Sequence, residues 1–411
     1  MTALPAALLA RLIRPFRPLP APVHIQVFAT LVNNMGGIAK LFLPLFFLEH
    51  FQLGYGRIGL LMGLYGAGCV AGAYLGGQLS DRFDARRLCA LLLAGSGLST
   101  FMLALPWQAG AYAPLLLVAG LCDGGFRPGN MRLVLEPCPP ALRLTAQGYY
   151  RVAFNLGVSL AGLTGGLLAS LGYHWVFVAQ GSANLLACVW LVWAYRRWPA
   201  TAGARAGAPS ASPALATTSP WRDGPFLVFI LGQLIIMAAF DQIYGTFSLF
   251  LREHYHASPS LVGMLFTLNG LMVVGLQVAL AHRVGRWGLI RSAQLGVLLT
   301  GGAYAFLNLG HGAFFAVITM VVLTVGELLL SPTWSALVMQ HSEGRRRGSY
   351  LGLFNAAWSG RTLYAPALGT WVYGALGPAL LWWSCVLLAL LTMALHAYAL
   401  PRMRSAAAPQ Q

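Results

Sequence analysis

Long apolar segments recur along this chain and leave little room for charged residues. Hydrophobic residues make up 58% of the 411 positions, charged residues only 9%, and the mean hydropathy is +0.68. An ordinary soluble domain carries about 25% charged residues, and a helix needs about 20 apolar residues to cross a bilayer. The sequence therefore predicts an all-α integral membrane protein. We expect twelve membrane-spanning helices, over residues 23–48, 57–80, 87–107, 112–134, 146–170, 174–195, 225–251, 259–281, 289–309, 312–338, 348–374 and 378–400.

One polar stretch divides these segments into two sets of six. Residues 196–224 are rich in Ala, Pro, Ser, Thr and Gly, a composition that cannot bury a core and is typical of a linker. The sequence therefore predicts three parts: an N-terminal six-helix bundle with its tail (1–195), a linker (196–224) and a C-terminal six-helix bundle with its tail (225–411).

The two halves carry traces of an internal duplication. A motif at residues 76–88, between the second and third segments, returns in degenerate form at residues 280–291. The offset that superimposes the two copies aligns further pairs without gaps: Glu49 with Glu253, Asp123 with Glu327, and Pro128 with Pro332. Parallel repeats of several spans are an architecture of secondary transporters.

The net charge of +16 reflects where the arginines lie. Nineteen arginines fall on one predicted side of the membrane, and only Arg57 and Arg252 fall in the opposite loops. By the positive-inside rule both termini, the linker and the duplicated loop are predicted to be cytoplasmic. The charge thus indicates topology rather than nucleic-acid binding. Heavy arginine use with a single lysine favours a bacterial inner-membrane protein, which we expect to be a monomer.

Common catalytic and nucleotide-binding motifs are missing from the sequence. It contains no Gly-x-x-x-x-Gly-Lys-Ser/Thr loop, His-Glu-x-x-His, Cys-x-x-Cys or Gly-x-Ser-x-Gly, so ATP-driven transport and these enzyme classes are disfavoured. The six cysteines show no metal-ligand spacing. We expect neither enzyme activity nor a cofactor or metal.

The duplicated motif has a recognisable pattern: a glycine, Asp-Arg four residues later, and then a basic pair. Its residues are Gly77, Asp81, Arg82, Arg86 and Arg87. This pattern closely resembles the signature of the major facilitator superfamily. The resemblance implies two pseudo-symmetric six-helix bundles, and a gating loop in which Gly77, Asp81, Arg82 and Arg86 latch the halves together in the outward-facing state. The alternative is a solvated loop that only sets topology.

One position departs from that family pattern. The residue after Asp-Arg-Phe, usually a glycine, is Asp84 here. A helix end often needs a left-handed residue, and Asp tolerates that conformation better than most. We therefore expect the turn to be retained with Asp84 in place of the glycine.

Ionisable residues inside the predicted spans are costly and are candidates for function. Asp123 and Arg127 lie one helical turn apart in the fourth span and can pair locally. Glu327, the repeat equivalent of Asp123, has Ser331 where the fourth span has Arg127, and is the less compensated acid. Further intramembrane charges are Lys40 in the first span, Asp241 in the seventh and Arg361 in the eleventh.

In the superfamily the first, fourth, seventh and tenth helices line a central cavity. The resemblance therefore places five charged residues around one pathway: Lys40, Asp123, Arg127, Asp241 and Glu327. Two alternatives stay open. The acids could form permanent ion pairs, Asp123 with Arg127, and Asp241 or Glu327 with Arg361, and Lys40 could snorkel to the interface.

Polar and aromatic residues on the same predicted faces are candidates for lining the substrate site. Aromatic rings can stack on flat or cationic substrates, although packed or lipid-facing rings are the alternative. Residues 151–157 resemble the fifth-span signature of the drug:proton antiporters, except that Ala161-Gly162 replaces the usual Gly-Pro pair. The candidates are Asn33, Tyr150, Asn155, Tyr244, Trp334 and Trp358.

These observations favour a proton-coupled exporter of small amphipathic or drug-like compounds that works by alternating access. Asp241 and Glu327 would exchange protons, while Arg127 and Arg361 would modulate them. One alternative is a symporter or uniporter for a metabolite such as an organic anion, sugar or peptide, which the cavity cations favour. Another is a non-transporting membrane sensor or scaffold on the same fold.

Overall fold

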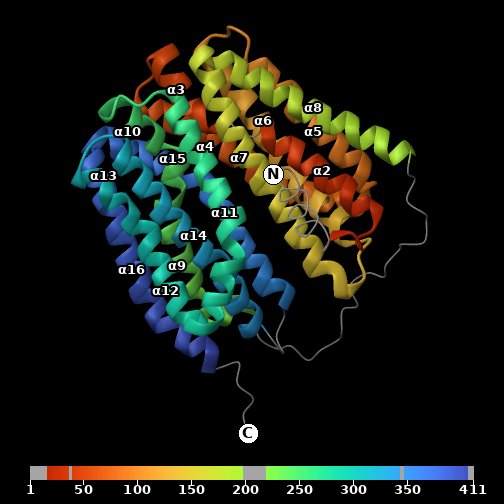
Figure 1. Ribbon diagram of the computed structural model, residues 1–411, viewed down its shortest axis with the longest axis vertical. Helices are drawn as coiled ribbons and strands as arrows, with labels where there is room; N and C mark the ends of the chain where they lie inside the picture. The colour runs from red at the N-terminus through yellow and green to blue at the C-terminus, as the bar shows by residue number, and fades with distance from the viewer. Residues whose placement is uncertain (1–15, 37–38, 198–218, 343–346, 406–411) are drawn as a thin grey trace, which may run out of the picture.

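A computed structural model describes residues 16–36, 39–197, 219–342 and 347–405. Within these ranges the chain is helical and contains no β-strand. Figure 1 shows two groups of helices side by side, the N-terminal group in red to yellow and the C-terminal group in green to blue. The predicted all-α architecture of two bundles is confirmed. Most of the predicted linker falls in residues 198–218, outside the described ranges.

The helices of the N-terminal half follow the first six predicted segments, and residues 37–38 of the first segment lie outside the described ranges. They are α2 (Ala21–Gly36), α3 (Ala39–Phe51), α4 (Tyr55–Arg82), α5 (Ala85–Leu103), α6 (Tyr112–Leu135), α7 (Arg143–Leu171) and α8 (Tyr173–Arg197).

The helices of the C-terminal half follow the other six segments. They are α9 (Gly224–Phe240), the 3-10 turn η5 (Asp241–Tyr244), α10 (Thr246–His254), α11 (Pro259–Trp287), α12 (Leu289–Gly302), the turn η6 (Ala303–Ala305), α13 (Phe306–Leu309), α14 (Ala313–His341), α15 (Arg347–Leu376) and α16 (Pro378–Ser405).

Within the described ranges, nine helices are long and apolar enough to cross a membrane. The third, ninth and eleventh predicted segments are not among the nine. The ninth is interrupted by η6 after the 14 residues of α12. The expected count of twelve spans is therefore not reproduced by helix length and hydropathy alone. It depends on matching the observed helices to the twelve predicted segments.

Glycines of α4 allow two close helix contacts. A Cβ on Gly72 would collide with the carbonyl of Leu121 on α6, within the same half. A Cβ on Gly66 would collide with the carbonyl of Thr362 on α15, in the other half. Helix backbones approach this closely only where the side chain is a hydrogen atom. One face of α4 thus packs inside its own bundle, and another joins the bundles.

Asp84 does not use the left-handed conformation that an aspartate tolerates. Asp84 is extended, with φ −60° and ψ 111°, and its side chain accepts a hydrogen bond from the backbone N–H of Arg86 as the N-cap of α5. The left-handed residue occurs in the second copy of the motif, where Gly288, aligned with Asp84, has φ +84°. An aspartate can start a helix by capping it, so the first copy needs no positive φ.

Candidate transport pathway

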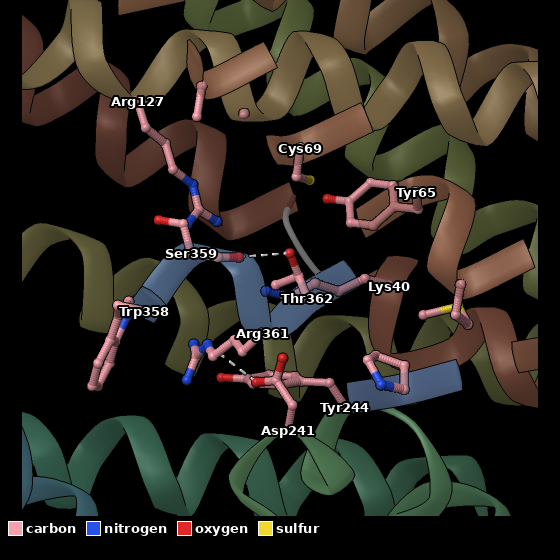
Figure 2. Close-up of a pocket in the computed structure, with 14 residues that line it drawn as sticks. Lys40, Tyr65, Cys69, Arg127, Asp241, Tyr244, Trp358, Ser359, Arg361 and Thr362 are labelled. Atoms are coloured by element: carbon pink, nitrogen blue, oxygen red, sulfur yellow. Dashed lines mark hydrogen bonds and ion pairs between the residues drawn. The ribbon is translucent and has the colours of Figure 1, made fainter. Parts of the chain in front are cut away.

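Two adjoining chambers lie between the halves and share the side chains of Lys40, Tyr65, Arg127 and Tyr244. The first chamber, drawn in Figure 2, is also lined by Cys69, Asp241, Trp358, Ser359, Arg361 and Thr362. The second is also lined by Asn33, Asp123, Tyr150, Phe154, Asn155, Asn269 and Glu327. The six charged residues singled out in the sequence therefore meet in one cavity between the halves.

The seventh predicted segment is not one continuous helix, because α9 ends at Phe240 and η5 follows. A helix end leaves backbone carbonyls without intrahelical partners. Here the Gln242 amide donates to the Ala238 carbonyl at 2.7 Å, and the Tyr304 hydroxyl donates to the Phe240 carbonyl at 3.3 Å. Side chains thus stabilise the break, and the break places Asp241 at the wall of the first chamber.

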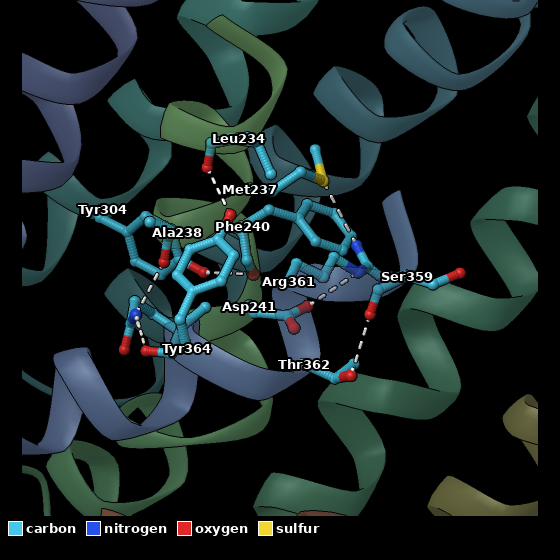
Figure 3. A network of polar contacts seen from close by, with 12 residues as sticks. Leu234, Met237, Ala238, Phe240, Asp241, Tyr304, Ser359, Arg361, Thr362 and Tyr364 are labelled. Atoms are coloured by element: carbon cyan, nitrogen blue, oxygen red, sulfur yellow. Dashed lines mark hydrogen bonds and ion pairs between the residues drawn. The ribbon is translucent and has the colours of Figure 1, made fainter. Parts of the chain in front are cut away.

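Asp241 faces Arg361 across this break, as Figure 3 shows. The Arg361 Nε lies 3.3 Å from Asp241 Oδ1, and the two side chains are 14% and 2% exposed. The Arg361 guanidinium also stacks between Phe240 and Trp358, at 4.7 and 4.8 Å from the ring centres. Yet Asp241 Oδ1 accepts no hydrogen bond from any described residue. The Asp241 carboxylate is therefore close to its cation without being fully hydrogen-bonded, so a proton or a ligand can compete with Arg361 for it.

Asp123 is held by neutral donors. The Tyr65 hydroxyl donates to Asp123 at 2.8 Å, and the Ser96 hydroxyl donates at 2.5 Å. Although Arg127 lies one turn away on α6, the described structure contains no ion pair between the two. The local pairing considered from the sequence is therefore not formed here.

Glu327 has a matching environment on the other side of the cavity. Its Oε2 lies 3.5 Å from the Asn269 amide, which also donates to Thr324 at 2.9 Å. The offset that aligns Asp123 with Glu327 also aligns Tyr65 with Asn269, so both repeats place a polar side chain of the second helix against an acid of the fourth. Sequence analysis missed Tyr65 and Asn269, and the duplication was the signal that could have identified them.

Lys40 and Arg127 have no counter-ion among the described residues. The Lys40 ammonium lies 4.6 Å from the centre of the Tyr244 ring. Arg127 is exposed to the open space of the cavity and makes no hydrogen bond or ion pair with the rest of the described chain. Figure 2 shows both side chains extending into the chamber that contains Arg361 and Asp241.

Most of the candidate lining residues reach the cavity. Trp358 lines the first chamber, Tyr244 lines both, and Asn33, Tyr150 and Asn155 line the second. Trp334 does not belong to the described walls of either chamber. It is fully buried, with its ring centre 5.8 Å from Phe229 and 5.5 Å from His396, because its face of α14 turns toward α9 and α16.

The halves are also joined at one end of the cavity. Arg252 of α10 pairs with Glu49 of α3 at 2.5 Å. Glu253, the repeat equivalent of Glu49, accepts hydrogen bonds of 2.6 Å from Tyr55 of the N-terminal half and from Tyr373 of its own half. This cluster lies at the end of α4 opposite the duplicated motif, since α4 begins at Tyr55 and ends at Arg82.

At the motif end, the described contacts lie within the N-terminal half. The Arg86 guanidinium lies 4.8 Å from the centre of the Tyr195 ring, and Arg82 is exposed. A Cβ on Gly77 would meet nothing within 4 Å. The side chain of Asp81 lies outside the described part of the structure. A latch formed by these residues stays a prediction.

A charged cavity between two helical bundles that are related by an internal repeat defines a membrane transporter of the secondary type. The chain belongs to the Major Facilitator Superfamily, whose family model matches residues 26–360 and 230–411. The superfamily assignment made from the motif is confirmed, and it implies a lipid bilayer and small-molecule substrates.

Relatives of several kinds resemble this chain. It is 24% identical to the uncharacterized MFS-type transporter YttB of Bacillus subtilis, over 85% of this chain and 88% of the relative. It is 26% identical to the 3-(3-hydroxy-phenyl)propionate transporter of Escherichia coli, over 66% of each. It is 23% identical to the class B tetracycline resistance protein of Escherichia coli, over 73% and 76%.

Among solved structures, a mutant of the peptide transporter POT in complex with alafosfalin has a TM-score of 0.78. The two sequences are 16% identical, and the match covers 94% of this chain and 96% of that one. At this identity the likeness concerns the fold.

Proposed function

We propose that this protein is a proton-coupled exporter of small amphipathic compounds that binds its substrate between the two bundles. The observation that supports this most strongly is the pair of acids in the cavity. Asp241 lies beside Arg361, but its Oδ1 accepts no hydrogen bond from the described residues, and Glu327 has the Asn269 amide as its nearby polar contact. Ionisable groups at such places in transporters commonly form proton relays.

In this mechanism, protonation of Asp241 weakens its attraction for Arg361, and the freed guanidinium changes how α15 packs on η5. Glu327 exchanges its proton with the cavity. The contacts around Glu49 and Glu253 hold one end closed, and they separate when the motif end closes. The protein functions as a monomer in the bacterial inner membrane, with both termini in the cytoplasm. The kinship with a tetracycline resistance protein supports export.

A second candidate is a proton symporter for an organic anion. The unpaired cations Lys40 and Arg127 favour it, as does the resemblance to a hydroxyphenylpropionate transporter.

Inside-out vesicles test the direction and the coupling. With an acidified lumen, we expect accumulation of amphipathic probes by the wild-type protein and loss of accumulation in Asp241→Asn and Glu327→Gln. Glu136→Gln, which changes an acid paired with Arg132 outside the cavity, is the matched control and should transport normally. If both cavity variants retain proton-driven transport, the assignment of these acids as proton carriers is wrong. Uptake only by right-side-out vesicles would favour the symporter.

A further inference from the structure

We infer that the transported compound is an amphipathic organic anion, with a carboxylate or similar compact head bound by Lys40 and Arg127 and an aromatic body bound by the surrounding rings. This inference deepens the proposed function, because it rests on the cavity being the transport site.

The charge balance of the first chamber is uneven. Its described walls carry three cations, Lys40, Arg127 and Arg361, and one acid, Asp241. Arg361 already lies against that acid at 3.3 Å and stacks on two rings. Lys40 and Arg127 therefore have no acid in this chamber as a partner.

The acids of the second chamber do not neutralise these two cations by contact. Asp123 accepts hydrogen bonds from Tyr65 and Ser96, and Glu327 contacts Asn269. No described acid lies within ion-pair distance of Lys40 or Arg127. An unpaired cation inside a membrane protein is costly, so a site that keeps two of them is suited to a ligand that brings the negative charge. The planar guanidinium can hold a carboxylate through two parallel hydrogen bonds, and an ammonium adds a point charge.

The position of the two cations says where the ligand head would lie. Lys40 and Arg127 are among the few residues common to both chambers, so a head bound there sits at the junction between them. Tyr244 lies beneath Lys40, Tyr65 belongs to the same shared wall, and Trp358 lines the first chamber. These rings provide a surface for the flat, apolar part of the same molecule.

Binding of three naphthalene compounds to the purified full-length protein tests this directly. The compounds, 2-naphthoate, 2-naphthalenemethanol and 2-naphthylmethylammonium, share one ring system and differ in the charge of the head. By calorimetry near neutral pH, we expect naphthoate to bind about tenfold tighter than the alcohol, and the ammonium compound to bind most weakly. Lys40→Gln and Arg127→Gln should each weaken naphthoate binding about tenfold and change alcohol binding less than twofold.

Matched controls separate recognition from folding. Arg222→Gln removes an exposed arginine of the 3-10 turn before α9 and should change nothing. Lys40→Arg and Arg127→Lys keep the charge and should retain part of the preference. If the alcohol or the ammonium compound binds the wild-type protein as tightly as naphthoate, or naphthoate does not bind, the inference is overturned, whatever the variants do.

The same compounds distinguish this inference from the proposed function. Tight naphthoate binding without proton-driven flux in proteoliposomes would support the anion site and reject the transport proposal. Proton-driven flux of the ammonium compound alone would support the transport proposal and reject the anion site.

Discussion

Arg252 of α10 donates a 2.5 Å hydrogen bond to Glu49 of α3, joining the two halves of the transporter at one end of its cavity. The glutamate next to Arg252, Glu253, is the repeat equivalent of Glu49 and bonds to Tyr55 across the same boundary. The duplication thus provides two equivalent acids, and both contact the opposite half at this end of the cavity.

Removing this ion pair should make the cavity easier to enter from that end. Both side chains are partly exposed, at 40% and 31%, so the pair is worth about 0.2–1 kcal/mol. We therefore expect Glu49→Gln to raise the rate at which a membrane-impermeant maleimide labels Cys69 from that side by about two- to fivefold. Cys69 is a native reporter, because it is free and lines the first chamber. The exchanged pair Glu49→Arg with Arg252→Glu should restore slow labelling, and failure to do so would count against a closing role.

Neutralising Glu327 should separate proton coupling from substrate binding. Glu327→Gln keeps the shape of the side chain and its contact with Asn269 but cannot release a proton. We expect proton-driven accumulation to be lost while substrate exchange across the membrane continues without a gradient. Loss of exchange as well, in a variant that still folds, would assign Glu327 to substrate binding.

Breaking the pair of Asp241 and Arg361 from one side should destabilise the protein more than removing both charges. Arg361→Met leaves Asp241, 2% exposed, without its cation, and an uncompensated buried charge costs about 3–5 kcal/mol. Arg361→Met combined with Asp241→Asn should recover much of that loss. Thermal unfolding in detergent measures the coupling between the two changes. Additive effects would mean that the two side chains do not stabilise each other.

Two glycines of α4 should respond oppositely to the same substitution. Gly72→Ala places a Cβ against the Leu121 carbonyl, so α4 and α6 must separate and the melting temperature should fall. Gly77→Ala meets open space and should stabilise the helix by up to about 1 kcal/mol. If Gly77→Ala folds well and still transports poorly, this supports a role for Gly77 in the conformation in which the motif end is closed. Normal transport would reject a gating role for that residue.

A cluster before α9 should make stability depend on acid pH. Burial by itself would raise the pKa of Asp223. Hydrogen bonds from Tyr350, from His341 and from the backbone N–H of Phe226 lower the pKa by more than burial raises it, so the net pKa lies below the ordinary value. Because its pKa is lower in the folded protein, ionised Asp223 stabilises the fold at pH values above its unfolded-state pKa of about 4. This stabilisation is lost as the pH falls through the folded-state pKa. The melting temperatures of wild type and Asp223→Asn should therefore differ near neutral pH and converge in acid. A constant difference would contradict this.

The amino-acid sequence alone determined the class, the number of bundles and most of the cavity residues. Long apolar segments require a membrane, and each ionisable residue in such a segment stands out because burial makes it costly. Lys40, Asp123, Arg127, Asp241, Glu327 and Arg361 could therefore be singled out without coordinates, and they meet in one cavity.

Only the tertiary structure decided which of these charges are partnered and which are not. Helical spacing put Asp123 beside Arg127, but Tyr65 and Ser96 from other helices bind the acid instead. Trp334 has the spacing of a lining residue, yet its side chain turns into the C-terminal bundle. Periodicity defines a face along one helix, whereas partners depend on how that helix is rotated and packed against its neighbours, which distant residues set together.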